Sequence, residues 1–150
     1  MKHFAHLADL AALVGRPLAD SDWVVVEQHS IDAFAEATGD RQWIHIDPAR
    51  AAAGPFGSTI AHGFLTLSLM PVLKASAFTV DDVRMGVNYG LNRVRFPAPV
   101  PAGSRVRARF SLQAFESLPD GAQLTIEATI EREGSAKPVC VAELVTRHHR

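Results

Sequence analysis

The residues with the clearest chemical potential are an aspartate and a histidine five positions apart, Asp40 and His45. Both side chains can take up and release protons when their pKa values are tuned, so the two types suit acid–base work. On one continuous helix, residues five apart point about 140° away from each other and cannot act on one atom. Joint action therefore requires a loop. The residues alone leave open that Asp40 caps a backbone turn and that His45 is an ordinary packed or surface histidine.

Signals on both sides of the pair predict this loop. Gly39 is typical of a helix end, and we expect that helix to begin at Ser30 as its N-cap. Asp47 followed by Pro48 is typical of a helix start, which predicts a short second helix from Pro48 to Ala53. The residues between the two helices are free to form a loop in which both side chains converge.

The longest apolar segment predicts a helix from about Ile60 to Lys74, capped by Ser58 or Thr59. Pro71 should bend its last turn, because proline lacks the N–H that continues a helix. The segment has no broad polar face, so we expect it to be buried on most sides. It is shorter than the roughly 20 apolar residues of a membrane span, and no span is expected.

Short elements should precede this helix and long strands should follow it. Ala5 to Val14 has helical spacing, and Trp23 to Gln28 has the β-branched content of a first strand. After Lys74 the pattern changes to period two, as in half-buried antiparallel strands. The inward positions of the two clearest strands are Val106, Ala108, Phe110, Leu112 and Ala114, then Leu124, Ile126, Ala128 and Ile130.

Turn residues divide these strands. Pro119-Asp120-Gly121 and Glu133-Gly134-Ser135 predict two turns, and Val139 to Val145 a last strand. A first strand, an apolar helix and about four long strands predict an α+β fold. In this hot-dog arrangement a curled antiparallel sheet wraps around a central buried helix. The length of 150 residues predicts that residues 1–150 form a single domain. Exposed sheet edges predict a homodimer with a continuous sheet.

The composition excludes several classes of protein. Hydrophobic residues make up 47% and charged residues 21%, which is typical of globular domains. The N-terminus has an early acid, Asp9, and no long apolar core, so we expect no secretory signal and a cytoplasmic location. The single cysteine, Cys140, lies in a strand-like run, where a buried inert thiol is expected rather than a nucleophile. No cofactor loop and no metal-ligand spacing is present.

Arginines concentrate in one part of the chain. Six arginines and no Asp or Glu lie between Val83 and Phe115, although the net charge is −1. Such a block can bind an anionic ligand or line solvent-facing strands. Without interleaved aromatic residues, it does not indicate nucleic-acid binding.

Three ordered motifs resemble the MaoC-like (R)-specific enoyl-CoA hydratases, in particular their nodulation-protein-N-like branch. The motifs are Gly39-Asp40 followed by His45, then Ile60-Ala61-His62-Gly63-Phe64, and Asn88 to Val100. Together they cover most of the chain. One departure is Gln42-Trp43, where many of these hydratases have Asn-Pro, and it leaves the loop shape and the acyl preference open.

The resemblance implies a hydro-lyase that adds water across a trans-2-enoyl thioester of coenzyme A or of acyl carrier protein, without a cofactor or metal. His45 would be the general base as water attacks C3. Asp40 would orient the water and handle the proton delivered to C2. The backbone N–H of Gly63 would stabilise the thioester oxygen, helped by the helix dipole and by the absence of a side chain.

The resemblance also implies a set of substrate-binding residues, each with an ordinary structural alternative. His62 would line the mouth of the site or pack in the first helical turn. Asn88 and Tyr89 would line the pocket or be ordinary strand residues. Arg93 and Arg95 share a strand face, which suits the phosphates of coenzyme A or a solvated surface.

Two other functions fit the same fold. A hot-dog thioesterase would hydrolyse the thioester, and a non-catalytic module would bind an acyl thioester or a partner without turnover. The spacing from Asp40 to His45, without a nucleophile, favours hydration over both.

Overall fold

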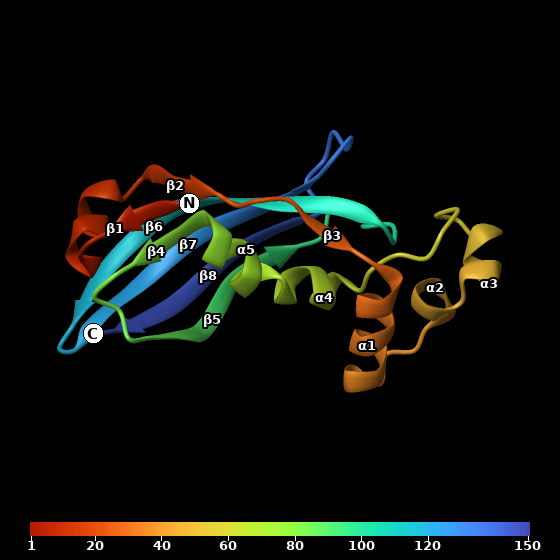
Figure 1. Cartoon of the computed structure of the whole chain (residues 1–150), viewed down its shortest axis with the longest axis horizontal. Helices are drawn as coiled ribbons and strands as arrows, with labels where there is room; N and C mark the ends of the chain where they lie inside the picture. The colour runs from red at the N-terminus through yellow and green to blue at the C-terminus, as the bar shows by residue number, and fades with distance from the viewer.

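The computed structural model describes all residues 1–150, and its main feature is an antiparallel sheet that curls around a helical segment (Figure 1). The sheet has six strands: β2 (Arg16–Asp20), β3 (Val24–Val26), β5 (Met85–Arg95), β6 (Ser104–Leu118), β7 (Gly121–Arg132) and β8 (Cys140–His149). Their order is β2-β6-β7-β8-β5, and β3 also pairs with β6. The remaining strands, β1 (Lys2–Phe4) and β4 (Phe78–Val80), form a separate parallel pair.

The period-two pattern is confirmed along the long strands, with one exception. The first four predicted inward residues of β6 are buried, and so are all four of β7. Ala114 is exposed instead, because a register shift between Leu112 and Ala114 reverses the alternation and turns Phe115 inward. The turn at Pro119-Asp120 is confirmed between β6 and β7.

The central helix consists of two pieces, α4 (Gly63–Ser68) and α5 (Met70–Ala77). The break at Leu69 precedes Pro71 and confirms the predicted bend. The predicted start was wrong. Ile60 pairs with Pro101 in an isolated bridge, and the N-cap is His62 rather than Ser58 or Thr59.

The core lies between this helix and the inner face of the sheet. Leu65, Met70 and Leu73 pack in one cluster with Phe110, Ile126 and other inward sheet residues. This arrangement confirms the α+β hot-dog fold. The helix is less buried than predicted, because Phe64 is 71% and Val72 50% exposed on its outer side.

The N-terminal predictions were partly wrong. Residues Leu7–Leu13 form a 3-10 helix, η1, and the predicted first strand is the short third strand β3. Helix α1 (Gln28–Thr38) begins with Glu27 as N-cap. The carbonyl of Glu27 already accepts from the N–H groups of Ser30 and Ile31, so Ser30 lies inside the helix. No helix has the length and apolar character needed to cross a bilayer.

Candidate active site

Three helices gather at one end of the molecule, beside the start of α4 (Figure 1). They are α1, α2 (Trp43–Ile46) and α3 (Pro48–Ala52). Gly39 ends α1 in the left-handed conformation, with φ of 79°. The predicted loop after it contains one helical turn, α2, and the predicted cap Asp47 accepts from the N–H of Arg50 at 3.0 Å.

The reversal at Gly39 brings Asp40 and His45 together. Asp40, His45 and His62 each offer one carboxylate oxygen or ring nitrogen, and these atoms lie within 4.8 Å of one another. His45 and His62 are buried, whereas solvent reaches Asp40. In this cluster the two histidines are therefore shielded from solvent and the carboxylate of Asp40 is accessible to it.

One contact fixes the protonation of His45. Its Nδ1 lies 2.6 Å from the carbonyl oxygen of Ile60, which can only accept a hydrogen bond. Nδ1 therefore carries the proton of the neutral ring, and Nε2 keeps a free lone pair. The backbone of His45 is also held, because its carbonyl accepts from the side-chain amide of Gln28 at 2.7 Å.

His62 is buried beside this pair. Its ring stacks on that of His45 with centroids 3.8 Å apart and an interplanar angle of 23°, and Phe34 covers it at 4.9 Å. Its Nε2 donates to the carbonyl of Asp40 at 2.9 Å. Its Nδ1 is buried without a partner. His62 thus ties the backbone of Asp40 to the ring of His45.

The departure at Gln42-Trp43 has a structural consequence. The side-chain amide of Gln42 donates to Oδ1 of Asp40 at 3.3 Å. Trp43 packs against Gly54 and lies under the guanidinium of Arg50, 4.4 Å from the ring centroid. The two residues therefore orient the aspartate and join α2 to α3.

The arrangement does not fit a metal ion. Lone pairs of imidazole nitrogens lie in the ring plane, so two stacked, nearly parallel rings do not direct them at one point. Nε2 of His62 is also engaged with a carbonyl oxygen. Asp40, His45 and His62 are therefore poorly arranged to bind one metal ion together.

Gly63 follows His62 in the chain and is the first residue of α4. A helix leaves the first N–H groups without an intrahelical acceptor, and that of Gly63 is one of them. A Cβ at this position would lie 3.0 Å from Cδ2 of Phe96, so the helix start and that ring meet closely.

The other predicted residues lie on the edge strand β5. Asn88 and Tyr89 line a groove beside the central helix, and the ring of Tyr89 lies 3.6 Å from the guanidinium of Arg147. Arg93 and Arg95 are exposed and form no ion pair. Neither arginine forms a hydrogen bond with Asp40, His45 or His62, and Arg95 donates to the carbonyl of Val94 instead.

Sequence reasoning missed two residues that support the site. The side-chain oxygen of Gln28 accepts from the hydroxyl of Thr59, while its amide donates to the carbonyl of His45. Both residues lie far from the catalytic motif in the chain, and Gln28 was assigned to a strand. Cys140 is buried as predicted, and burial raises its pKa to about 11, so its thiol is not a nucleophile at neutral pH.

The sequence and the fold of this chain are similar to those of known proteins. A family model described as "MaoC like domain" matches residues 9–133. The chain is 58% identical to 3-hydroxyacyl-thioester dehydratase Z of Mycobacterium tuberculosis over 99% of each chain. It is 47% identical to nodulation protein N of Rhizobium leguminosarum, over 96% of this chain and 91% of that protein. The R-hydratase PhaJ1 from Pseudomonas aeruginosa has the same fold, with a TM-score of 0.77 and 24% identity over 98% of this chain and 87% of that one.

Proposed function

Because the chain belongs to the MaoC-like domain family, we propose that it is a 3-hydroxyacyl-thioester dehydratase, an (R)-specific enoyl-thioester hydratase in the reverse direction. The observation that carries the proposal is the juxtaposition of Asp40 with a His45 whose Nδ1 is bonded to the carbonyl of Ile60. That bond leaves Nε2 as the available base. The addition of water requires a base, here Nε2 of His45, next to a carboxylate that solvent can reach, here Asp40.

In the hydration direction, one water molecule is bound between the two side chains. Its oxygen forms the new bond to C3 while Nε2 of His45 removes a proton. The electron pair of the double bond moves toward the thioester, and the proton taken from the water passes from His45 through Asp40 to C2, so both side chains end each turnover in their starting protonation states. Dehydration follows the same steps in reverse. Each hydration consumes one water and one C2–C3 double bond, and each dehydration forms them again.

The negative charge of the intermediate accumulates on the thioester oxygen. The free N–H of Gly63 is a preorganised donor for that oxygen, and a donor of this kind typically contributes about 10²-fold or more to kcat. His62 supports both catalytic residues by stacking on His45 and holding the carbonyl of Asp40. It acts as a positioning residue.

The substrate is a thioester of coenzyme A or of acyl carrier protein. Asn88 and Tyr89 would line the acyl groove beside the central helix. Arg93 and Arg95 are unpaired cations on the neighbouring strand surface, and they would meet the phosphates of the carrier.

The functional unit is proposed to be a homodimer of single-domain chains, each comprising residues 1–150. β5 is a sheet edge with no neighbour on its outer side, and apolar side chains are exposed along it and on the adjacent helix surface. The most exposed are Phe64, Val72, Met85, Val87, Tyr89 and Leu91. Pairing of two β5 strands would continue the sheet and cover these side chains.

The test is to incubate the protein with crotonyl-CoA and follow the enoyl absorbance and the free thiol together. Hydration lowers the enoyl absorbance without releasing thiol and gives the (R)-3-hydroxyacyl product. Thiol release would establish a thioesterase instead. Binding without a change in either signal would leave a non-catalytic acyl-thioester module.

A further inference from the structure

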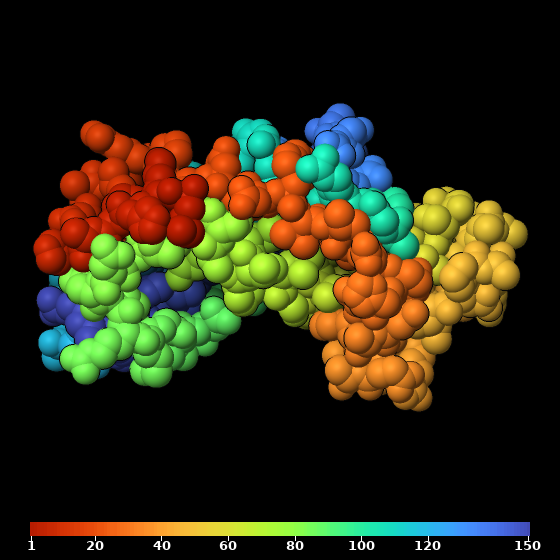
Figure 2. Space-filling model, in the orientation of Figure 1, coloured from red at the N-terminus to blue at the C-terminus, as the bar shows by residue number.

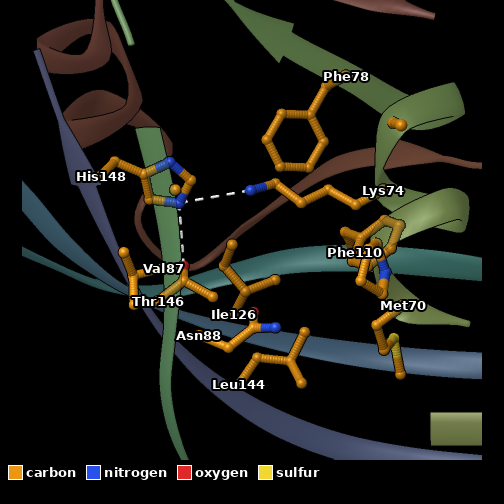
Figure 3. A pocket seen from close by; sticks show the side chains of 13 residues that line it. Met70, Lys74, Phe78, Val87, Asn88, Phe110, Ile126, Leu144, Thr146 and His148 are labelled. Atoms are coloured by element: carbon orange, nitrogen blue, oxygen red, sulfur yellow. Dashed lines mark hydrogen bonds between the residues drawn. The ribbon is translucent and has the colours of Figure 1, made fainter. Parts of the chain in front are cut away.

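A cavity of about 320 Å³ lies between α5 and the strands β5 and β8 (Figure 3), and neither Asp40 nor His45 lines it. Most of its wall is apolar and includes Phe78, Val87, Ile126 and Leu144. The space-filling view shows the molecule hollowed between α5 and β5, with β8 behind (Figure 2). Its volume is that of a small-ligand pocket, about 300–1,000 Å³.

The cavity adjoins a second one of about 350 Å³. Both are lined by Met70, Pro71, Asn88, Leu144 and Thr146, and the second extends to Leu67 and Ser68 of α4. The two cavities together, here called the groove, extend along the central helix. The groove begins about one helical turn beyond Gly63, because a turn contains 3.6 residues.

The far end of this groove is polar, in contrast to its walls. The ammonium of Lys74 reaches from α5 to within 3.4 Å of Nε2 of His148 on β8, and the hydroxyl of Thr146 lies 3.0 Å from the same nitrogen. Figure 3 shows Lys74 and His148 pointing toward each other across the cavity, with Phe78 above them. An ammonium only donates hydrogen bonds, so this contact requires that Nε2 is the unprotonated nitrogen.

Lys74 has no counter-ion in this environment. No Asp or Glu lines the cavity, and Lys74 takes part in no ion pair. Burial lowers the pKa of Lys74 to about 8 and that of His148 to about 4, so at neutral pH the lysine is mostly charged and the histidine neutral. A charge in apolar surroundings is costly unless it is paired, which leaves room for an anion.

We propose that the groove binds the acyl chain of the substrate and that this chain ends in a carboxylate, which pairs with Lys74. Lys74 lies eleven positions after Gly63, so an acyl group whose thioester lies at Gly63 would span about 16 Å along the helix. The placement of the thioester at Gly63 rests on the proposed function. His148 and Thr146 act as positioning residues that hold the ammonium toward the cavity.

The test uses saturated, unreactive acyl-CoA ligands of equal chain length that end either in a methyl group or in a carboxylate. Isothermal titration calorimetry should show that the wild type binds the carboxylate ligand more tightly, by about 10-fold or more. Lys74→Met, which keeps the length of the side chain without its charge, should abolish or reverse this ratio. Lys137→Met removes an exposed lysine and should leave the ratio unchanged.

Two further measurements separate charge pairing from a change in folding. Lys74→Gln should also lose the preference, with a circular dichroism spectrum like that of the wild type. The affinity of the wild type for the carboxylate ligand should fall as the pH rises through about 8, where Lys74 loses its proton, while the methyl ligand provides the matched baseline.

The possible results are distinct. Equal binding of both ligands by the wild type, or an unchanged ratio in Lys74→Met, would overturn the assignment even if crotonyl-CoA is hydrated. A carboxylate preference that depends on Lys74 would support it. If that preference is found but no enoyl-CoA is hydrated, the proposed reaction fails and the anion-binding end of the groove remains.

Discussion

At the scale of single residues, the chemistry of the cluster depends on which nitrogen of His45 carries the proton. The carbonyl of Ile60 holds the proton on Nδ1, and the stacked ring of His62 prevents the imidazole from tilting. On the other side, the amide of Gln42 donates to Oδ1 of Asp40. Asp40 and His45 are therefore both held in one orientation, and in the proposed reaction this preorganisation lowers the cost of reaching the transition state.

Replacement of either catalytic residue should abolish most of the activity without unfolding the chain. Asp40→Asn and His45→Gln should each lower kcat by at least ~10²-fold, the usual effect of losing an acid or a base. Steady-state kinetics with an enoyl-CoA measures the effect, and circular dichroism checks the fold. The matched controls are Asp81→Asn and His29→Gln, since both residues are exposed and outside the cluster. Near-normal turnover of a site variant would make that residue structural.

At the scale of elements, five of the six arginines in the block divide between two strands, and Arg84 precedes both. On β6, Arg105 pairs with Glu133, and both Arg107 and Arg109 pair with Glu131 on β7. On β5, Arg93 and Arg95 form no ion pair. The β6 arginines stabilise strand pairing, and the β5 arginines are free to meet an anion.

This division predicts where coenzyme A is bound. Arg93→Ala combined with Arg95→Ala should raise KM for an enoyl-CoA and leave kcat almost unchanged, as expected when binding is lost equally in ground and transition states. Salt should raise the KM of the wild type more than that of the double variant, because exposed charges are screened over about 8 Å at physiological ionic strength.

Two controls make the measurement specific. Arg109→Ala removes a paired arginine of similar exposure from β6 and should not change KM. A pantetheine thioester lacks the nucleotide phosphates and should not distinguish the double variant from the wild type. Equal losses on both substrates would mean that Arg93 and Arg95 act through stability.

The elements also differ in how far the sequence alone predicted them. Alternation in β6 and β7, the end of α1 at Gly39 and the start of α3 at Asp47 depend on local residue types, and they were predicted. The start of α1, the bulge beyond Leu112 and the start of α4 depend on contacts with distant segments, such as the bridge between Ile60 and Pro101. Such contacts leave no local pattern.

The same reason explains which parts of the site were found. Asp40 and His45 belong to one short motif, and the helix signals on either side of it, Gly39 and Asp47-Pro48, predicted the loop between them. The stacking of His62 on His45 joins residues seventeen positions apart, and the cavity at Lys74 needs residues of β8 from the other end of the chain. Neither could be derived from spacing.

At the scale of the whole molecule, one surface is incomplete. The outer edge of β5 and the exposed side of α4 and α5 carry apolar groups without a partner. Light scattering should therefore give the mass of a dimer. Leu91→Lys on that edge should yield monomers, whereas Val25→Lys places the same charge on an equally exposed position of β3 and should keep the dimer. A fully active wild-type monomer would contradict the proposed assembly.

The buried His148 should make the folded chain sensitive to acid. Burial, the charge of Lys74 and that of His149 lower its pKa to about 4 from 6.5 in the unfolded chain. Between these values the unfolded chain binds a proton that the folded chain does not. The contribution of His148 to the free energy of unfolding is therefore complete above pH 6.5 and is lost as the pH falls toward 4, on the order of 3 kcal/mol.

Urea unfolding over this pH range measures the effect. His148→Gln cannot titrate but can still accept from Lys74, so its stability should fall less steeply between pH 6.5 and 4. His3→Gln, which changes an exposed histidine, should follow the wild type. Identical slopes for His148→Gln and the wild type would show that other groups cause the acid sensitivity.

The position of Trp43 has a consequence for observing the molecule at work. The chain has two tryptophans, and the other, Trp23, lies on the sheet, 4.8 Å from the guanidinium of Arg107. In a Trp23→Phe chain, all indole fluorescence would come from the turn between Asp40 and His45. Its emission would then report how often this helical turn opens while the sheet stays folded, a local fluctuation separate from global unfolding. The protein thus carries an intrinsic fluorophore beside the reacting groups.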